Sequence, residues 1–355
     1  MAYTTIDDPS AYFYIQLYTG SSSGQSITND ANAGDFKPDW VWIKRRDGDP
    51  NVVGNGHHSL YDSSRGVQKE LYSDLDSAEA TNSNGLTAFG TDGFTVGTEA
   101  RVNSNGLSFV SWQWKANGGT TSTNTDGSEN STVQVNSTAG FSIVKRTGTG
   151  SAGATYGHGL GAVPDVIINK GLNTNEWYSY FKAIGGGTHW IDLSGTGAAV
   201  ADANMWNNTD ATSTVFTVGN SGGSNGSGVE YINYCFKEVQ GYSKFGSYTG
   251  NGNADGPFVY TGFKPAWVMI RRTDAVENWI MLDNKREPFN VVTKRLYADT
   301  SGAESTSGTR MDFVSNGFKL RQSVGDINTS SGTYIYMAFA ENPFTTSDGV
   351  PTTAR

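Results

Sequence analysis

Cysteine and histidine are scarce in this chain of 355 residues. Cys235 is the only cysteine, so no intrachain disulfide can form and the fold must be held by packing and hydrogen bonds. There are four histidines, and the chain has no His/Cys spacing typical of zinc. We therefore expect no cofactor and no metal site. A weak calcium site at Asp47 and Asp49 is the alternative, because this loop offers oxygen donors.

Long apolar runs and basic charge are also lacking. No uncharged apolar stretch approaches the roughly 18 residues that a membrane-spanning helix requires. Residues 1–8 have no basic segment followed by an apolar run, so no signal peptide is predicted. The net charge of −9 argues against a nucleic-acid partner, which would need a basic face to neutralise phosphates. We expect synthesis in the cytoplasm without a signal peptide, no membrane insertion and no nucleic-acid partner.

Glycine and aromatic residues, in contrast, are abundant. The chain has 45 glycines, and charged residues make up only 17% of it, which is typical of short strands joined by many turns. Nine Trp, 17 Tyr and 17 Phe supply large side chains for several small cores. The composition predicts an all-β protein of antiparallel sandwiches, jelly-roll or lectin-like in architecture.

Three strongly alternating segments superimpose without a gap: FVSWQWK at 109–115, YINYCFK at 231–237 and YIYMAFA at 334–340. With a period of two, one face of each expected strand is an apolar row. The rows are Val110/Trp112/Trp114, Ile232/Tyr234/Phe236 and Ile335/Met337/Phe339. We expect these three strands to be central and buried on that face.

Each segment also has an earlier strand introduced by proline, at Pro38, Pro164 and Pro265. Proline is tolerated at the first residue of a strand because it gives up no interior hydrogen bond of the sheet. A further strand is expected before each of these, at 13–20, 141–148 and 245–250. The chain is therefore predicted to hold three tandem copies of one sandwich module.

The first and third copies agree over a longer stretch. Residues 69–74 match 294–299 at an offset of 225, and residues 78–81 match 303–306 at the same offset. Residues 62–65 match 283–286 at an offset of 221, each beginning with Asp and ending with Arg. We interpret these Asp/Arg pairs as exposed salt bridges that pin a turn, worth about 0–1 kcal/mol. A sugar- or ion-binding role is the alternative.

These patterns predict the domain organisation. We expect an N-terminal segment at 1–10, sandwich modules at 11–117, 140–241 and 242–344, and a C-terminal tail at 345–355. Residues 118–139, rich in Ser, Thr, Asn and Gly, are expected to form a linker with one short strand at 132–136. The first module is then expected to swing relative to the other two.

The repeated strands resemble a group of virion proteins of marine tailed phages, known as hypothetical, tail-fibre or structural proteins with repeated β-sandwich domains of unknown function. The resemblance rests on FVSWQWK at 109–115, GSYTGNG at 246–252, GFKPAWVMI at 262–270 and TYIYMAFAENPF at 333–344, and it runs nearly end to end. It implies a location on the virion surface, at the tail or the capsid. It brings no agreed active site.

Aromatic residues outside the repeated rows gather in the middle module, whose segments between strands depart most from the repeat. Flat aromatic faces beside amides and carboxylates suit a sugar ring. We therefore predict a low-affinity binding site of Trp177, Tyr178, Trp190, Trp206 and Asn207. Packing of these side chains in the core or between modules is the alternative.

No repeated or singular catalytic cluster accompanies the repeat, so we expect the protein not to be an enzyme. The predicted function is that of a phage virion structural protein of the tail-fibre or appendage type that contributes to host adsorption. The expected partners are other virion proteins, further copies of the chain in a homo-oligomer, and host surface glycan. A purely structural capsid decoration protein and a carbohydrate-binding module array remain the alternatives.

Overall fold

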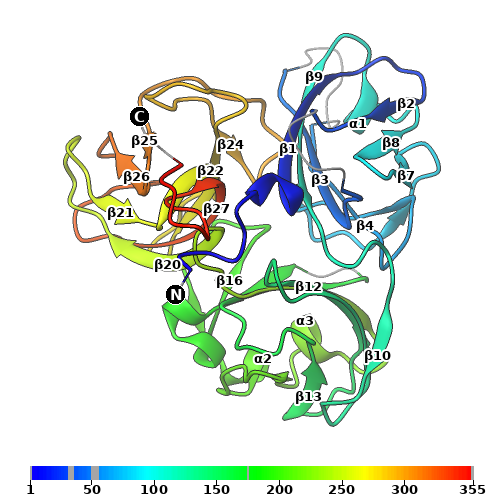
Figure 1. The fold of residues 1–355 in the computed structure, drawn as a ribbon. Helices are drawn as coiled ribbons and strands as arrows, with labels where there is room; N and C mark the ends of the chain where they lie inside the picture. The colour runs from blue at the N-terminus through cyan, green and yellow to red at the C-terminus, as the bar shows by residue number, and fades with distance from the viewer. Residues whose placement is uncertain (1, 31–35, 49–55, 174–175, 353–355) are drawn as a thin grey trace.

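The computed structural model describes residues 2–30, 36–48, 56–173 and 176–352. These residues form an all-β fold of several antiparallel sheets with a few one-turn helices (Figure 1), which confirms the expected all-β class. Figure 1 shows three lobes around a common centre: residues 11–117 in blue and cyan, 118–241 in green, and 242–344 in yellow to red. We call these the first, middle and third segments.

The first segment pairs a large sheet with a small one. Among its described residues the large sheet has the order β1-β9-β3-β4, the small one β2-β8-β7, and β5 pairs with β6. Apolar side chains of the two sheets, such as Ile43 and Phe94, form an outer core between them. The elements are η1 (Pro9–Ala11), β1 (Phe13–Thr19), β2 (Gln25–Ile27), β3 (Trp40–Arg45), β4 (Ser59–Asp62), β5 (Lys69–Glu70), β6 (Ala80–Thr81), β7 (Leu86–Phe89), β8 (Phe94–Val96), α1 (Ala100–Asn103) and β9 (Ser108–Trp114).

The middle segment has the largest sheet of the described chain, in the order β10-β11-β12-β19-β14-β15-β16-β17, and a small β13-β18 pair. Its outer core includes Ile167 and Phe216. The elements are β10 (Ser122–Asn124), β11 (Ser131–Asn136), β12 (Phe141–Thr147), β13 (Ala154–Gly157), β14 (Val166–Gly171), β15 (Trp177–Phe181), η2 (Lys182–Ile184), η3 (Gly186–Thr188), β16 (His189–Asp192), β17 (Val200–Ala201), α2 (Ala203–Trp206), β18 (Val215–Val218), α3 (Gly222–Asn225) and β19 (Glu230–Phe236).

The third segment repeats the plan of the first. Its described strands form the sheets β20-β27-β22-β23-β24 and β21-β26-β25, with Ile270 and Phe318 in the outer core. The elements are β20 (Ser243–Thr249), β21 (Phe258–Tyr260), β22 (Phe263–Arg272), β23 (Ile280–Asp283), β24 (Leu296–Tyr297), β25 (Met311–Val314), β26 (Gly317–Leu320) and β27 (Thr333–Pro343).

The strands predicted from the repeat are present, but none begins at its proline. β3 and β14 begin two residues after Pro38 and Pro164, and Pro265 lies inside β22 at a register shift. β9, β19 and β27 lie between the two other predicted strands of their segment. The strand predicted at 132–136 is β11, which pairs with β12, and β10 pairs with β11 in turn. The stretch predicted as a linker therefore extends the sheet of the middle segment, because its alternating Val133 and Val135 pair with β12 and pack against the apolar cluster of that segment.

All nine side chains of the three predicted apolar rows belong to a single cluster at the centre of the molecule. Trp40 of the first segment stacks on Tyr234 of the middle one at a centroid distance of 4.2 Å, and Trp114 lies 5.7 Å from Phe339 of the third. Each large sheet thus has one face on its own outer core and one on the shared centre. The first segment does not have the freedom that we expected, because its inner face is buried against both other segments.

Equivalent hydrogen bonds close the three segments into a ring. The register of the strands places His58, Trp177 and Trp279 at equivalent positions, four residues before Asp62, Phe181 and Asp283. Each directs a ring nitrogen at a backbone carbonyl of another segment: Trp177 Nε1 donates to Tyr72 O (2.7 Å), Trp279 Nε1 to Asp192 O (2.7 Å), and His58 Nε2 lies 2.9 Å from Tyr297 O. The middle segment therefore bonds to the first, the first to the third, and the third to the middle.

Backbone hydrogen bonds also join each segment to the other two. The amides that donate and the carbonyls that accept lie at equivalent places of neighbouring segments, at distances of 2.8 to 2.9 Å. The three bonds run from Glu79 N to Leu172 O, from Glu304 N to Arg46 O and from Ala199 N to Thr273 O. Backbone hydrogen bonds of this kind fix the relative position of the segments in addition to the apolar contacts.

The Asp62/Arg65 and Asp283/Arg286 pairs do pin turns, as predicted, but they are not exposed. The four side chains are 0 to 1% exposed, and Arg286 Nε lies 2.5 Å from Asp283 Oδ2. Glu79 and Glu304 extend the two pairs to triads. The contribution of about 0–1 kcal/mol that we expected for an exposed pair is therefore wrong. Removal of one partner would leave an uncompensated buried charge, which lowers the free energy of unfolding by about 3–5 kcal/mol.

Candidate functional site

Two of the residues predicted to bind a ligand lie in cores. Trp177 is fully buried in the central cluster, where its Nε1 makes the hydrogen bond to Tyr72, and Trp206 is 1% exposed in the outer core of the middle segment. A sugar cannot stack on a ring that protein atoms cover on both faces. For these two tryptophans the prediction is corrected, and the alternative of core and interface packing holds.

The remaining three predicted residues lie nearer the surface. Tyr178 and Trp190 are half-buried and meet edge to face at 4.9 Å, and the Tyr178 hydroxyl donates to Glu176. Asn207 ends α2 with a left-handed backbone, φ 56°. The structure thus brings Tyr178 and Trp190 together on the middle segment, whereas Asn207 has the role of a helix cap.

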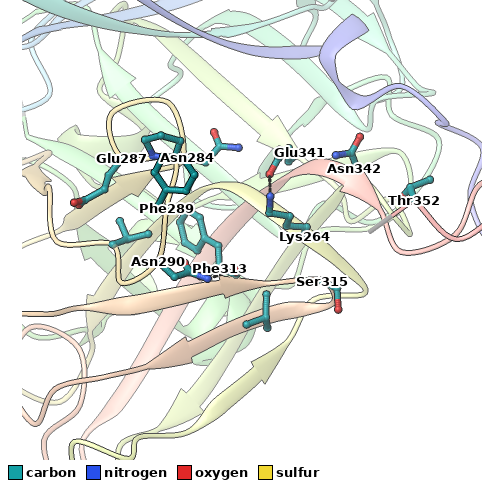
Figure 2. Close-up of a pocket in the computed structure, with 13 residues that line it drawn as sticks. Lys264, Asn284, Glu287, Phe289, Asn290, Phe313, Ser315, Glu341, Asn342 and Thr352 are labelled. Atoms are coloured by element: carbon teal, nitrogen blue, oxygen red, sulfur yellow. Dashed lines mark hydrogen bonds and ion pairs between the residues drawn. The ribbon is translucent and has the colours of Figure 1, made fainter. Parts of the chain in front are cut away.

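A groove of about 460 Å³ lies on the third segment, away from the predicted residues (Figure 2). Its volume is in the range of small-molecule sites. Aromatic, amide and charged side chains line it together, and the principal ones are Lys264, Asn284, Glu287, Phe289, Phe313 and Asn342. This combination of a ring face with hydrogen-bonding groups is the one that the sequence predicts for the middle segment.

Phe289 is the most exposed large apolar side chain of the described residues, at 73%. Phe313, which is 4% exposed, lies close to it in Figure 2. Full burial of a Phe side chain stabilises a fold by about 1.5–3 kcal/mol. Phe289 makes little of this contribution because it is exposed. The fold therefore gives no reason for a large aromatic residue at this position.

The loop that carries Phe289 is anchored at both ends. Glu287 Oε2 accepts hydrogen bonds from the amides of Thr293 (2.6 Å) and Lys294 (2.8 Å) and from the Thr293 hydroxyl (2.9 Å). The Asn290 side chain pairs with both backbone groups of Phe313, at 2.8 and 2.9 Å. These bonds hold Phe289 in a fixed place although it has little packing of its own.

The same loop is an insertion relative to the first segment. The offset between the two copies is 221 at Asp62 and Asp283 but 225 at Lys69 and Lys294, so the third segment has four additional residues in between. Residues 287–290, which fall in this stretch, all line the groove. The change of offset was the signal in the sequence that could have located this site, because residues added to a repeat are not needed for its scaffold.

The charges of the groove are fixed by their neighbours. Lys264 Nζ lies 2.6 Å from Glu341, as the dashed line in Figure 2 marks. For Glu287, burial raises the pKa, but the hydrogen bonds from Thr293 and Lys294 outweigh it, so the pKa is lowered. Glu287 is therefore a carboxylate at neutral pH, suited to accept hydrogen bonds and unsuited to act as a general acid.

The described residues contain no group of three or more His, Cys, Asp or Glu side chains that could hold a metal ion. Asp47, proposed above as a calcium ligand, accepts a hydrogen bond from the Ser108 amide at 2.5 Å, and Asp49 lies outside the described residues. In the same part of the chain, no helix is long and apolar enough to cross a bilayer.

Comparison with known proteins gives a family without an assigned role. No curated protein matches the chain. One family model, described as a domain of unknown function (DUF7483), matches residues 8–343 and so runs through all three segments. The chain belongs to this family of unknown function, DUF7483.

Proposed function

We propose that the protein is a structural protein on the surface of a tailed-phage virion, on the tail or the capsid, and that it contributes to host adsorption by binding surface glycan. Its three segments would be copies of one β-sandwich module fused into a closed ring. The phage location is supported by the resemblance of the repeated strands, and the ring by the equivalent hydrogen bonds between segments.

The observation that carries the glycan role is Phe289: an aromatic ring, 73% exposed, on an anchored insertion beside amides and a carboxylate. The ring offers a face to the C–H side of a sugar, and Asn284, Glu287 and Asn342 offer hydrogen bonds to its hydroxyls. A virion carries many copies, so millimolar affinity per site is enough for adhesion. The lowered pKa of Glu287 keeps it a carboxylate that can accept hydrogen bonds from sugar hydroxyls.

The test is binding of the purified protein to host cells and to a glycan array, compared with Phe289→Ala. The substitution removes an exposed ring, so thermal unfolding should stay unchanged while binding falls at least tenfold. Phe258→Ala is the matched control, because Phe258 is 47% exposed in the same segment but lies outside the groove. Bound glycan should be recovered uncleaved.

Three outcomes would count against the proposal. Equal binding by Phe289→Ala would remove the groove as the site. Cleavage of the glycan would replace a binding role by a hydrolytic one. If the intact protein binds no host surface and no glycan, a purely structural decoration role is the better account of the fold.

A further inference from the structure

The groove of Figure 2 does not end at the third segment. A second hollow of about 390 Å³ shares Asn284, Glu341 and Asn342 with it and continues over the first segment. The residues from the first segment and the N-terminal stretch include Asp8, Tyr14 and Asp30. Two hollows with three common lining residues form one trough, which crosses the boundary between the first and third segments.

From this continuity we infer that the ligand is an extended, uncharged glycan chain that lies along the trough, with one sugar on Phe289 and later sugars over the first segment. This inference rests on the proposed function and specifies its substrate class. A single sugar would occupy only one of the two hollows. A chain of sugars has hydroxyl groups along its whole length and matches a trough with polar side chains in both hollows.

Lys285 lines the second hollow and connects the third segment to the first. It stands in the turn just before the Phe289 insertion, and its Nζ lies 3.2 Å from the Tyr14 hydroxyl and 4.9 Å from the centre of the Tyr14 ring. Asp30 lies 3.8 Å from the same ammonium group. Lys285 and Asp30 are both exposed, so their hydrogen-bonding groups face solvent at the far end of the trough.

Asn284 lies where the two hollows meet. It lines both of them, together with Glu341 and Asn342. An amide side chain can both donate a hydrogen bond to a hydroxyl group and accept one from it. The trough therefore has polar groups at its centre and at its far end, and an aromatic platform at its near end.

The charge of the trough indicates an uncharged ligand. The opposite charges of Lys264 and Glu341 cancel in their ion pair. The remaining charged side chains that line the trough are three carboxylates, those of Asp8, Asp30 and Glu287, and one ammonium group, that of Lys285. The chain as a whole carries −9. Uronic acids or sulfated sugars would be repelled by this excess, whereas neutral hexoses would not.

The experiment measures binding of a neutral oligosaccharide series, from one to six sugar units, to the intact protein and to two variants. We expect affinity to rise at least tenfold between the shortest and longest members. Lys285→Ala should remove most of that rise and leave the affinity of the shortest binding member unchanged. Phe289→Ala should weaken every member, since it removes the near-end platform. Lys182→Ala, an exposed lysine of the middle segment, is the control and should bind as the intact protein does.

The outcomes separate this inference from the function on which it rests. Binding of short and long members with equal affinity, or an unchanged length dependence in Lys285→Ala, would overturn the extended ligand but leave a glycan site at Phe289. Stronger binding of a uronic-acid series than of the neutral one would overturn the uncharged class. If no member of either series binds, the proposed glycan function itself fails.

Discussion

The Tyr234 hydroxyl donates a 2.8 Å hydrogen bond to Asp62 Oδ2 and so joins the middle segment to the first inside the shared core. The equivalent contact between the first and third segments runs from Trp112 Nε1 to Asp283 Oδ2, at 3.2 Å. At the third boundary, strand register places Phe181 where the aspartates stand and Met337 where the donors stand.

The pairing of a buried aspartate with a donor from the neighbouring segment has a physical reason. A buried carboxylate needs its hydrogen bonds satisfied, and Tyr234 and Trp112 each supply a donor from the neighbouring segment. Methionine has no donor, and at the boundary where Met337 stands, the aspartate is replaced by phenylalanine. Each Asp/Arg pair thus occurs where the segment that faces it can complete its hydrogen bonds.

Removal of the Tyr234 hydroxyl tests this contact. We expect Tyr234→Phe to lower the free energy of unfolding by about 1–3 kcal/mol, because Asp62 loses a partner in a buried site. Urea titration measures the loss. Tyr12→Phe is the control, because its hydroxyl makes no hydrogen bond within the described part of the chain and its loss should cost little. A double-mutant cycle with Asp62→Asn that gives no coupling energy would contradict a direct interaction.

Acidification should destabilise the protein through His58. Burial, followed by the charge of Lys44, lowers the pKa of His58 to about 3 from its ordinary 6.5. Neutral His58 accepts from Trp42 Nε1 on its Nδ1 (2.7 Å) and donates to Tyr297 O. Because the unfolded chain takes up the proton first, this stability is present above about pH 6.5 and is lost as the pH falls toward 3, by about 1.4 kcal/mol per unit.

The third segment provides the model for a variant that tests the role of His58 in acid sensitivity. The third segment has Met269 and Trp279 where the first has Trp42 and His58. The double substitution Trp42→Met, His58→Trp should keep the ring bond to Tyr297 and flatten the decline in stability between pH 6.5 and 4, as followed by urea titration at each pH. His189→Gln, at a half-exposed site, should leave the decline unchanged. A folded double variant with the original decline would place the acid sensitivity elsewhere.

The shared core predicts that the three segments unfold together. Trp114→Ala or Phe339→Ala should cost about 3–5 kcal/mol through lost burial and a cavity. Tryptophan fluorescence and far-UV circular dichroism should give coincident urea transitions, because no segment keeps its inner face covered when another opens. Phe258→Ala, at the surface, serves as the control. Two separate transitions would show that a segment is stable on its own.

Removal of metal ions should leave the thermal stability of the protein unchanged. We expect the melting temperature to be the same in a chelator and in millimolar calcium, because a ligand that binds only the folded state would raise it. Differential scanning calorimetry provides the measurement. A rise with calcium that Asp47→Ala abolishes would establish the alternative calcium site at this loop.

The repeated strands were readable from the sequence because their period is local. Alternation at 110–114, 232–236 and 335–339 depends only on neighbouring residues, and it predicted both the strands and the face that each one turns to the shared centre. It did not predict that the opposite face of each strand is buried as well. The turns at Asp62 and Asp283 were found for the same reason, since the Asp and the Arg lie three residues apart.

What covers each apolar face was decided by tertiary structure. A period of two shows that Trp112 is buried, but not that Tyr234 and Phe339 of other segments share its cluster, since such contacts join residues more than 100 positions apart. For the same reason, composition placed Trp177 and Trp206 in a binding site, whereas packing placed them in cores. The groove at Phe289 depended on a four-residue change of offset within the repeat and on the closure of the ring, which sets the first segment beside the third.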